Sequence, residues 1–422
     1  MIYLYNLVLL FFVFLALPYV SYRLLVKKDK ISAYGQKLGM YDITPPRKGG
    51  VWIHAVSVGE TNTAIPLVEE FSKRNPDVPV IFSTGTATGQ ALARKKLADD
   101  VTLAYFPLDF PMAVWSALSF FSPAVIVFME TEIWPNFIYQ ASRAGRKTML
   151  VNGRISDRSY ERYRNLKWFL APFMNSINRL LMQSDTDAER AVTLGAEKES
   201  VRVTGNLKFD RPPPGENESR EEIRRIFGIP AKASVVIFAS THPGEDELFL
   251  DASIKLKYEI EDIFTIIAPR HVERTADIKK LCIEYKLPVR LRSEEGETSG
   301  FTVMILDTYG ELAKLYGAAD LAVMGGSFIR HGGQNPLEAA AWKLPVIFGP
   351  HMENFRDISQ KLLDSRGAVR AGDKAELIAA SAKWLADKDA GQKAGLRGYN
   401  VILANRGALK KTVEAIEDLL EN

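Results

Sequence analysis

The sequence predicts an α/β protein with two Rossmann-like domains of doubly wound parallel sheet, preceded by an apolar N-terminal helix. Three observations lead to this fold. From Val51 onward, short apolar runs alternate with helical patterns, as in doubly wound layers. The alternation breaks once, at the proline-rich segment Arg211–Ser219, which has the composition of a linker. At 422 residues the chain also exceeds the usual size of one hydrophobic core.

The N-terminal segment Ile2–Leu25 is almost wholly apolar and is followed at once by Lys27, Lys28 and Lys30. About 20 apolar residues suffice to cross a bilayer, and basic residues after such a segment predict that the following chain is cytoplasmic. A cleaved signal peptide is the competing interpretation. It is disfavoured because no basic region precedes the apolar run and no A-x-A-like site follows it.

The domain boundaries follow from these patterns. We expect a membrane anchor at residues 1–26, a first domain at 31–210, a linker at 211–219, a second domain at 220–404 and a C-terminal helix at 405–422. The tail Asn405–Leu420 has apolar residues at helical spacing, and we expect it to pack outside one domain or to bridge both.

Seven short apolar runs predict the strands of the first sheet. They are Val51–Ser57, Val78–Ser83, Thr102–Phe106, Ala124–Met129, Thr148–Val151, Leu180–Gln183 and Val201–Thr204. Five further runs predict the second sheet. They are Val235–Ala239, Phe264–Ala268, Thr302–Leu306, Leu321–Met324 and Pro345–Phe348.

Composition excludes several classes of protein. The formal charge is +3, with 54 basic and 51 acidic residues, which gives no support to a nucleic-acid partner. The single cysteine, Cys282, allows no internal disulfide and fits a reducing compartment. The five histidines are scattered and lack the spacing of a metal site.

The segment Leu321–Phe355 organises the predicted second domain. It reads as strand, glycine-rich loop, helix near Pro336, and strand. Gly332 and Gly333 let backbone N–H groups approach an anion, and the start of the helix adds its positive end, so a phosphate is the expected ligand. Glu338 in the first helical turn is placed either to bind a ribose diol or only to complement the helix dipole.

In open α/β sheets, ligands bind beyond the carboxyl ends of the strands, and several strands here end in polar residues. Glu60 could act as a general base, although dipole compensation explains it as well. Glu130 and Glu132, two residues apart, follow another strand and are either site residues or helix N-terminal charges. Lys208 could neutralise a leaving phosphate or simply be solvated. Arg270 could hold a phosphate bidentately.

Two further patterns have competing explanations. Asp185-Thr186-Asp187 has the D-x-D form of metal-dependent glycosyltransferases, but it opens a helix, and capping by Ser184 or Asp185 explains it better. The segment Arg154–Leu181 interleaves basic with aromatic residues. That mixture suits a membrane-interfacial segment or a site for a phosphorylated lipid, and equally an amphipathic helix with a solvated basic face.

Six motifs in a fixed order carry a family resemblance. They are HAVSVGE (His54–Glu60), ETEIWPN (Glu130–Asn136), GNLKFD (Gly205–Asp210), APRH (Ala268–His271), DTYGEL (Asp307–Leu312) and GGQNPLEAAAWKLPVIFGP (Gly332–Pro350). Together they resemble the 3-deoxy-D-manno-octulosonic acid (Kdo) transferases of lipopolysaccharide synthesis. The resemblance extends from the apolar N-terminal segment to the last helix.

The resemblance implies a GT-B glycosyltransferase that moves Kdo from CMP-Kdo to the 6′-hydroxyl of the lipid A precursor lipid IVA, with inversion and without a metal or other cofactor. It further implies a single-pass enzyme of the inner membrane, acting at the cytoplasmic leaflet. Glu60 matches the general base, and Glu130 and Lys208 match positions that stabilise the transition state. Nine positions match contacts to CMP: Pro269, Arg270, Gly310, Glu311, Leu312, Asn335, Pro336, Leu337 and Glu338.

The sequence departs from the family pattern at Gln334 and Ala339, where His and Pro are common. Gln334 donates a hydrogen bond but carries no charge, which leaves its role toward a phosphate or sugar acid open. Two other functions compete with Kdo transfer. One is a GT-B transferase or epimerase that uses a UDP-sugar with a soluble substrate, and the other is a membrane-tethered binding protein without activity.

Overall fold

The computed structural model describes residues 1–11, 15, 31–211, 218–294 and 300–421. Residues 2–11 are helical. Most of the expected anchor and the centre of the expected linker lie outside these described ranges. Within them, no helix combines the length and the apolar character needed to cross a membrane.

The chain folds into two compact units, residues 1–210 with 406–422, and residues 211–405. Each unit contains one seven-stranded parallel sheet, with strand order β3-β2-β1-β4-β5-β6-β7 in the first and β10-β11-β9-β8-β12-β13-β14 in the second. The strand order reverses at β1/β4 and at β8/β12, which is the signature of doubly wound sheets. The predicted α/β fold with two such sheets is confirmed.

All seven strands predicted for the first unit form, with ends that differ by one or two residues. Ser57, for example, caps the next helix instead of ending β1. The strands are β1 (Val51–Ala55), β2 (Val80–Thr84), β3 (Thr102–Tyr105), β4 (Val125–Met129), β5 (Lys147–Gly153), β6 (Arg179–Met182) and β7 (Val201–Val203). The helices are α2 (Ile31–Lys37), α3 (Val58–Arg74), α4 (Ala87–Lys96), α5 (Pro111–Phe121), α6 (Pro135–Arg143), α7 (Asp157–Asn165), α8 (Lys167–Asn175), α9 (Asp185–Thr193) and α18 (Ala408–Glu421), with 3-10 turns η1 (Lys198–Ser200) and η2 (Leu207–Asp210).

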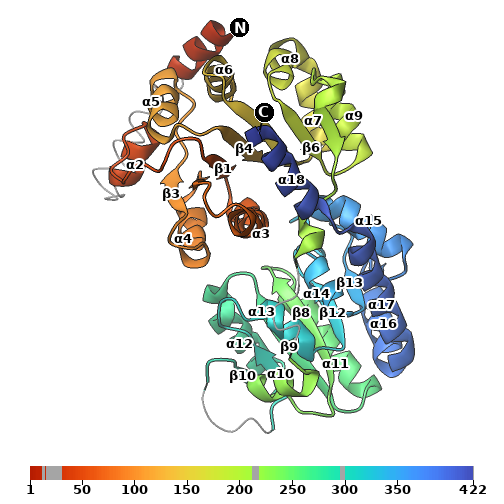
Figure 1. Ribbon diagram of the computed structural model, residues 1–422. Coiled ribbons are helices and arrows are strands. Elements are labelled where there is room, and N and C mark those ends of the chain that lie inside the picture. Colours follow the sequence, from red (N-terminus) through yellow and green to blue (C-terminus); the bar gives the residue numbers. More distant parts are fainter. Residues whose placement is uncertain (12–14, 16–30, 212–217, 295–299, 422) are drawn as a thin grey trace. The chain divides into compact units, whose positions relative to one another are not determined.

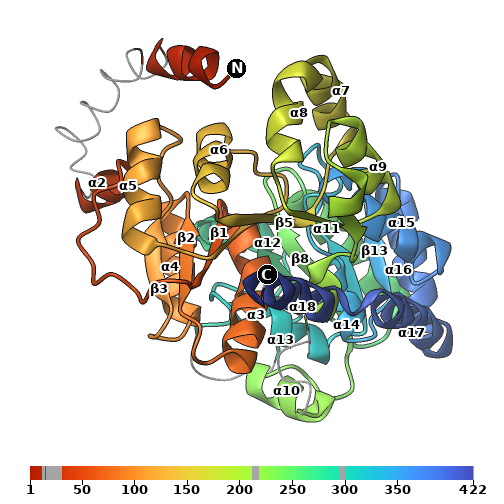
Figure 2. The same cartoon turned by 45° about the horizontal axis from the view of Figure 1, so that its top comes forward.

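Two cores lie on opposite faces of the first sheet. In β1, Val51 and Ile53 face a core that includes residues of α3, α4 and α18, whereas Trp52 faces one that includes residues of α5, α6, α8 and α9. Figure 2 shows α5 and α6 on one side of the sheet and α3 with α18 on the other. Because both faces are covered, β1 is buried throughout, which explains its continuous apolar character.

The second unit forms the five predicted strands and two that were not predicted, β10 and β14, which have only three residues each. Its strands are β8 (Ser234–Thr241), β9 (Ile263–Pro269), β10 (Val289–Leu291), β11 (Val303–Ile305), β12 (Leu321–Met324), β13 (Val346–Phe348) and β14 (Ala368–Arg370). Its helices are α10 (Arg220–Phe227), α11 (Asp246–Glu259), α12 (Thr275–Glu284), α13 (Leu312–Leu315), α14 (Leu337–Ala341), α15 (Arg356–Asp364), α16 (Lys374–Ala386) and α17 (Lys388–Asn405), with 3-10 turns η3 (Val272–Arg274), η4 (Tyr316–Ala318) and η5 (Glu353–Phe355).

The predicted helix near Pro336 is shorter than the sequence suggests. Pro336 precedes α14, which has five residues and ends at Ala341, before Lys343 adopts a left-handed conformation with φ 58°. A helix of little more than one turn has only a small dipole, so the positive helix end expected to attract a phosphate here is weak.

The C-terminal helix α18 belongs to the first unit, although it follows the whole second unit in sequence (Figure 1). Val413 and Ile416 are fully buried in the core shared with α3. The start of the helix is held by Asp210, whose carboxylate accepts hydrogen bonds from the backbone N–H groups of Gly407 at 2.6 Å and Leu409 at 2.9 Å.

Replacing Asp210 with alanine is expected to lower the free energy of unfolding by about 1–2 kcal/mol, because two N–H groups at the start of α18 lose their acceptor. Urea unfolding monitored by circular dichroism measures this change. Glu414→Ala is the matched control in the same helix, since its 3.9 Å pair with Lys410 is solvent-exposed and worth less than about 0.5 kcal/mol. Equal destabilisation by both substitutions would contradict the capping role.

Candidate active site

Glu60 lies in the first turn of α3, beyond the carboxyl end of β1, and only 9% of its surface is exposed. One carboxylate oxygen accepts the backbone N–H of Val56 at 2.8 Å, and the other accepts the hydroxyl of Ser57 at 2.9 Å. Burial raises the pKa of this carboxyl, an effect that the Val56 N–H opposes and nearby Glu130 reinforces. The carboxylate therefore completes a helix cap and is also a proton acceptor in a largely water-excluded place.

Glu130 and Lys208 come together at the same edge of the sheet, with 3.8 Å between a carboxylate oxygen and the lysine Nζ. Glu130 directly follows β4 and has a left-handed backbone with φ 56°, a conformation that costs free energy outside glycine. The turn that carries Lys208 is held by Asn152, whose side-chain oxygen accepts the N–H of Leu207 at 3.0 Å. The three catalytic residues implied by the resemblance are thus all in the first unit, two of them in contact.

Glu132 is a third carboxyl in this cluster, and the sequence left open whether it is a site residue or a helix N-terminal charge. Burial, together with the charges of Glu60 and Glu130, raises the pKa of Glu132 to about 7. The sequence showed that Glu130 and Glu132 lie two residues apart in an unusual loop. What the sequence did not show is that both side chains are electrostatically coupled to Glu60.

Replacing Glu132 with glutamine is expected to stabilise the protein more at pH 8 than at pH 4.5. Below pH 4.5 the carboxyl holds its proton in both the folded and unfolded chain. Between pH 4.5 and 7 the unfolded chain releases the proton first, so the stability of the wild-type protein falls as pH rises. Glutamine does not ionise, so the variant does not lose this stability. We expect the difference in the free energy of unfolding to be about 1–2 kcal/mol, after allowing for the partial exposure of Glu132.

Urea unfolding of both proteins at the two pH values measures this difference. Glu161→Gln serves as the control, because Glu161 is an exposed carboxylate of the same unit that pairs with Arg164 at 2.8 Å. A Glu132→Gln advantage that does not change with pH would show that Glu132 ionises as readily as a surface acid.

The nine positions expected to contact CMP are all in the second unit, in three loops beyond the carboxyl ends of the strands. Pro269 ends β9, and the backbone N–H of Arg270 donates to Thr241 O at 3.0 Å, which ties the ends of β9 and β8 together. The segment 310–312 follows β11, and the segment 335–338 lies between β12 and β13.

Two of these loops are held by side-chain contacts that the sequence did not show. The carboxylate of Glu311 pairs with Arg292 at 3.1 Å and accepts the hydroxyl of Thr308. In the third loop, the side-chain oxygen of Asn335 accepts the N–H of Leu337 at 3.2 Å. Glu338 is in the first turn of α14, as predicted, and its charge raises the pKa of buried Tyr316 beyond the rise due to burial.

Glu245 is a buried carboxylate that fixes the glycine-rich loop after β12. It is fully buried and accepts backbone N–H groups from Gly326 at 2.7 Å, His242 at 3.0 Å and Phe328 at 3.1 Å. Burial raises its pKa, and these N–H groups oppose that rise. This side chain thus ties the start of the glycine-rich loop to the turn after β8.

The Asp185-Thr186-Asp187 motif is structural, as the capping interpretation predicted. Ser184 caps α9, and the carboxylate of Asp187 accepts the N–H of Ile155 at 2.7 Å and the hydroxyl of Ser184 at 2.5 Å. Within the described ranges, no group of three or more metal-binding side chains comes together.

The basic and aromatic segment forms two helices, α7 and α8. Tyr160, Tyr163 and Phe169 pack against the core, whereas Trp168 is 57% exposed. Basic residues of α7 remain at the surface, and no residue of α7 is buried. The segment combines a packed aromatic side with a solvated basic side, so its geometry agrees with both interpretations.

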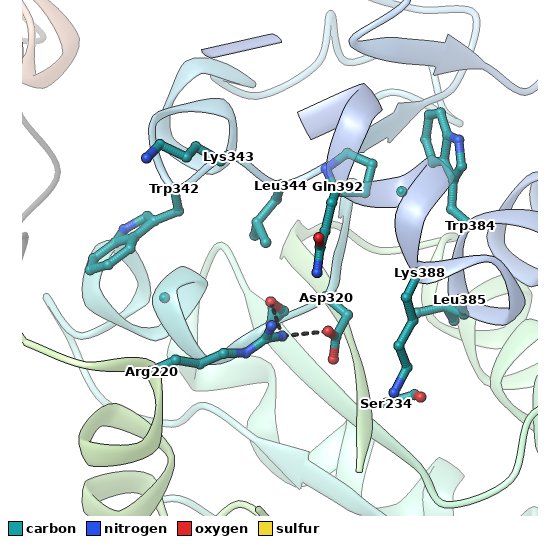
Figure 3. Close-up of a pocket in the computed structure, with 14 residues that line it drawn as sticks. Arg220, Ser234, Asp320, Trp342, Lys343, Leu344, Trp384, Leu385, Lys388 and Gln392 are labelled. Atoms are coloured by element: carbon teal, nitrogen blue, oxygen red, sulfur yellow. Dashed lines mark hydrogen bonds and ion pairs between the residues drawn. The ribbon is translucent and has the colours of Figure 1, made fainter. Parts of the chain in front are cut away.

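A cavity of about 300 Å³ lies at the opposite edge of the second sheet, beside the residues that begin β8, β12 and β13. Figure 3 shows Arg220 pointing to Asp320 at its base, an ion pair of 2.5 Å, with Trp342 and Trp384 on its sides. Because ligands of doubly wound sheets bind beyond the carboxyl ends of the strands, this cavity is separate from the expected nucleotide site.

Comparisons with known proteins agree with the motifs. A family model described as 3-Deoxy-D-manno-octulosonic-acid transferase (kdotransferase) matches residues 32–211. The 3-deoxy-D-manno-octulosonic acid transferase of Haemophilus influenzae is 33% identical over 393 residues, covering 92% of this chain and 91% of the relative. The one from Bordetella pertussis is 33% identical over 388 residues, with 89% and 88% covered.

Solved structures share the fold at low sequence identity. A glycosyltransferase from Rickettsia africae has a TM-score of 0.60 at 13% identity, covering 89% of this chain and all of the other. The UDP-GlcNAc 2-epimerase of Neisseria meningitidis has a TM-score of 0.61 at 12% identity, covering 88% and 100%. These likenesses concern the fold, whereas the sequence relatives span nearly the whole chain. The chain therefore belongs to the 3-deoxy-D-manno-octulosonic acid transferase family, the Kdo glycosyltransferases of lipopolysaccharide synthesis.

Proposed function

We propose that this enzyme transfers Kdo from CMP-Kdo to the 6′-hydroxyl of lipid IVA, with inversion at the anomeric carbon and without a metal or other cofactor. The observation that carries the proposal is the cluster of Glu60, Glu130 and Lys208 at the carboxyl edge of the first sheet. Membership of the family supports Kdo as the transferred sugar, and these residues would provide a base and a cation close together.

The reaction follows from the chemistry of these side chains. Glu60, when ionised, takes the proton of the acceptor hydroxyl, and the oxygen attacks the anomeric carbon from the face opposite to the phosphate. The bond between the anomeric carbon and the phosphate oxygen breaks, and CMP leaves with the electron pair. Lys208 offsets negative charge that develops as this bond breaks, and Glu130, 3.8 Å away, orients its ammonium group.

Donor binding is assigned to the second unit. Arg270 would hold the phosphate, and the loops at 310–312 and 335–338 would contact the nucleoside. Gln334 is half-buried in the glycine-rich loop and can donate a hydrogen bond there, without the charge of a histidine. Ala339, the other departure from the family pattern, is fully buried in α14, which gives it a packing role.

We further propose that the enzyme is held at the cytoplasmic leaflet of the inner membrane by a single-pass anchor within residues 1–26. The apolar run Ile2–Leu25 and the three lysines after it support this placement. The basic side of α7 and exposed Trp168 in α8 would face anionic lipid headgroups, as suits an enzyme whose acceptor is a phosphorylated glycolipid.

A transfer assay tests the proposal. Detergent-solubilised protein is incubated with CMP-Kdo generated in situ and lipid IVA, with and without EDTA, and products are read by mass spectrometry. Addition of Kdo regardless of EDTA is expected, and the mass counts the sugars added. No addition, with CMP binding still detectable by calorimetry, would overturn the acceptor assignment. Tighter binding of UDP than of CMP would instead favour the UDP-sugar alternative.

A further inference from the structure

His242 follows β8 and is 4% exposed. Its Nδ1 lies 3.0 Å from the carbonyl oxygen of Ser240. A carbonyl oxygen only accepts hydrogen bonds, so Nδ1 must carry the hydrogen in this contact. In the neutral ring, Nε2 is then left with a lone pair and can only accept.

The Nε2 atom of His242 is buried and has no hydrogen-bond partner among the described residues. Burial, together with the neighbouring charge of His331, lowers the pKa of the ring to about 4, so the ring is neutral near pH 7. A buried acceptor without a donor is unfavourable, because it has lost its hydrogen bond to water and has no hydrogen bond within the protein to replace it. The free protein thus keeps an unused acceptor at this point.

Two aromatic neighbours come from the loops on either side. The ring of His331, in the glycine-rich loop, lies 3.9 Å from that of His242, and the ring of His271, next to Arg270, lies at 6.3 Å. His242 therefore lies between the loop expected to hold the phosphate and the loop that leads to the expected nucleoside contacts. The three rings do not form a metal site within the described ranges.

The backbone around His242 is rigid. Glu245 accepts the His242 N–H at 3.0 Å, and Thr241 O accepts both the Arg270 N–H and the Arg274 guanidinium at 3.0 Å. Gly326, next to the His242 ring, has a left-handed backbone with φ 65°, which glycine adopts without strain. With its backbone N–H held by Glu245 and its Nδ1 by Ser240 O, His242 keeps one unused acceptor in a fixed place, as a recognition group requires.

We propose that His242 Nε2 accepts a hydrogen bond from a hydroxyl of the transferred sugar in the donor, which makes His242 a residue that selects the sugar. This inference rests on the proposed function. The partner must be a donor, which excludes the phosphate and the sugar carboxylate, since both are acceptors. The hydroxyl groups of the Kdo unit, which is joined through its anomeric carbon to a phosphate held by Arg270, meet this requirement, whereas the nucleoside is assigned to the loops at 310–312 and 335–338.

Two substitutions separate this role from a structural one. In His242→Asn the side-chain amide can still donate to Ser240 O, but nothing occupies the position of Nε2. In His242→Gln the amide oxygen reaches the position of Nε2 and restores an acceptor there. Steady-state kinetics with CMP-Kdo and inhibition by CMP are measured for both variants and the wild type, with thermal unfolding as a check on folding.

We expect His242→Asn to raise KM for CMP-Kdo about tenfold, with inhibition by CMP changed less than about twofold, because CMP lacks the sugar. His242→Gln is expected to stay within about threefold of the wild type. The reverse order, with Asn tolerated and Gln impaired, would assign the histidine to the Ser240 contact alone and overturn the proposal. Equal weakening of CMP and CMP-Kdo would overturn it as well.

This experiment keeps the two levels of inference apart. If wild-type protein transfers Kdo and both variants match it, the inference about His242 fails while the proposed function stands. If wild-type protein transfers no Kdo but binds CMP, the proposed function has failed before any variant is compared.

Discussion

Replacing Glu60 with glutamine is expected to reduce Kdo transfer about a thousandfold while CMP-Kdo binding stays within about twofold. Glutamine has the size of the carboxylate, and its amide oxygen can still accept the Val56 N–H, so α3 keeps its cap. What is lost is a group able to take the proton of the acceptor hydroxyl. Transfer rates under saturating donor and calorimetric titration with CMP measure the two effects separately.

The pH dependence of the wild type gives a second view of the same residue. Burial raises the pKa of Glu60, so the acidic limb of transfer activity should lie above the pH at which a surface glutamate titrates. Activity is lost as pH falls through this pKa, because only the ionised form accepts a proton. If the Glu60→Gln variant transfers Kdo with the wild-type rate and pH profile, another group is the base.

Replacing Lys208 with methionine is expected to lower the turnover number about a hundredfold, with little change in CMP binding. The ammonium group pairs with Glu130 at 3.8 Å, and methionine retains most of the length of the side chain without the charge. Removing one group that stabilises developing charge commonly costs about 100-fold to 1000-fold in turnover. Lys208→Arg, which retains the positive charge, should recover part of the loss.

A double-substitution cycle with Glu130→Gln distinguishes two roles of this lysine. If Lys208 acts on the leaving phosphate, the variant with both changes is at least as impaired as Lys208→Met alone. If Lys208 only neutralises Glu130, removing both charges restores turnover toward the wild-type value. Recovery of turnover in the double variant would thus show that Lys208 does not act in the catalytic step and serves only as the partner of Glu130.

The fold was largely predictable because buried parallel strands are continuous apolar runs, and twelve of the fourteen strands stood out in this way. The two that did not, β10 and β14, have three residues each and include Arg290 or Arg370. They are strands because the neighbouring strand supplies hydrogen bonds. Length alone does not explain why these two were missed, because β7, β11 and β13 also have three residues and were predicted.

Candidate site residues stood out in the sequence where a polar residue directly follows a strand, as Glu130 and Arg270 do, or opens the next helix, as Glu60 does. The sequence did not show that one residue can have two roles. Glu60 is both part of a helix cap and a buried acid. The contacts of Glu245 and His242 with the glycine-rich loop, some 80 residues away, could not be predicted from the sequence. Only the folded chain brings these groups together.

The return of α18 to the first unit makes the second unit an insertion in the chain. Val413 and Ile416 fill a core that otherwise consists of residues before position 210. During synthesis the ribosome delivers those earlier residues long before residues 408–421 emerge. The core of the first unit therefore stays incomplete, with apolar residues exposed, while the second unit is being made. The first unit is the later of the two to complete its core and depends more on protection from aggregation.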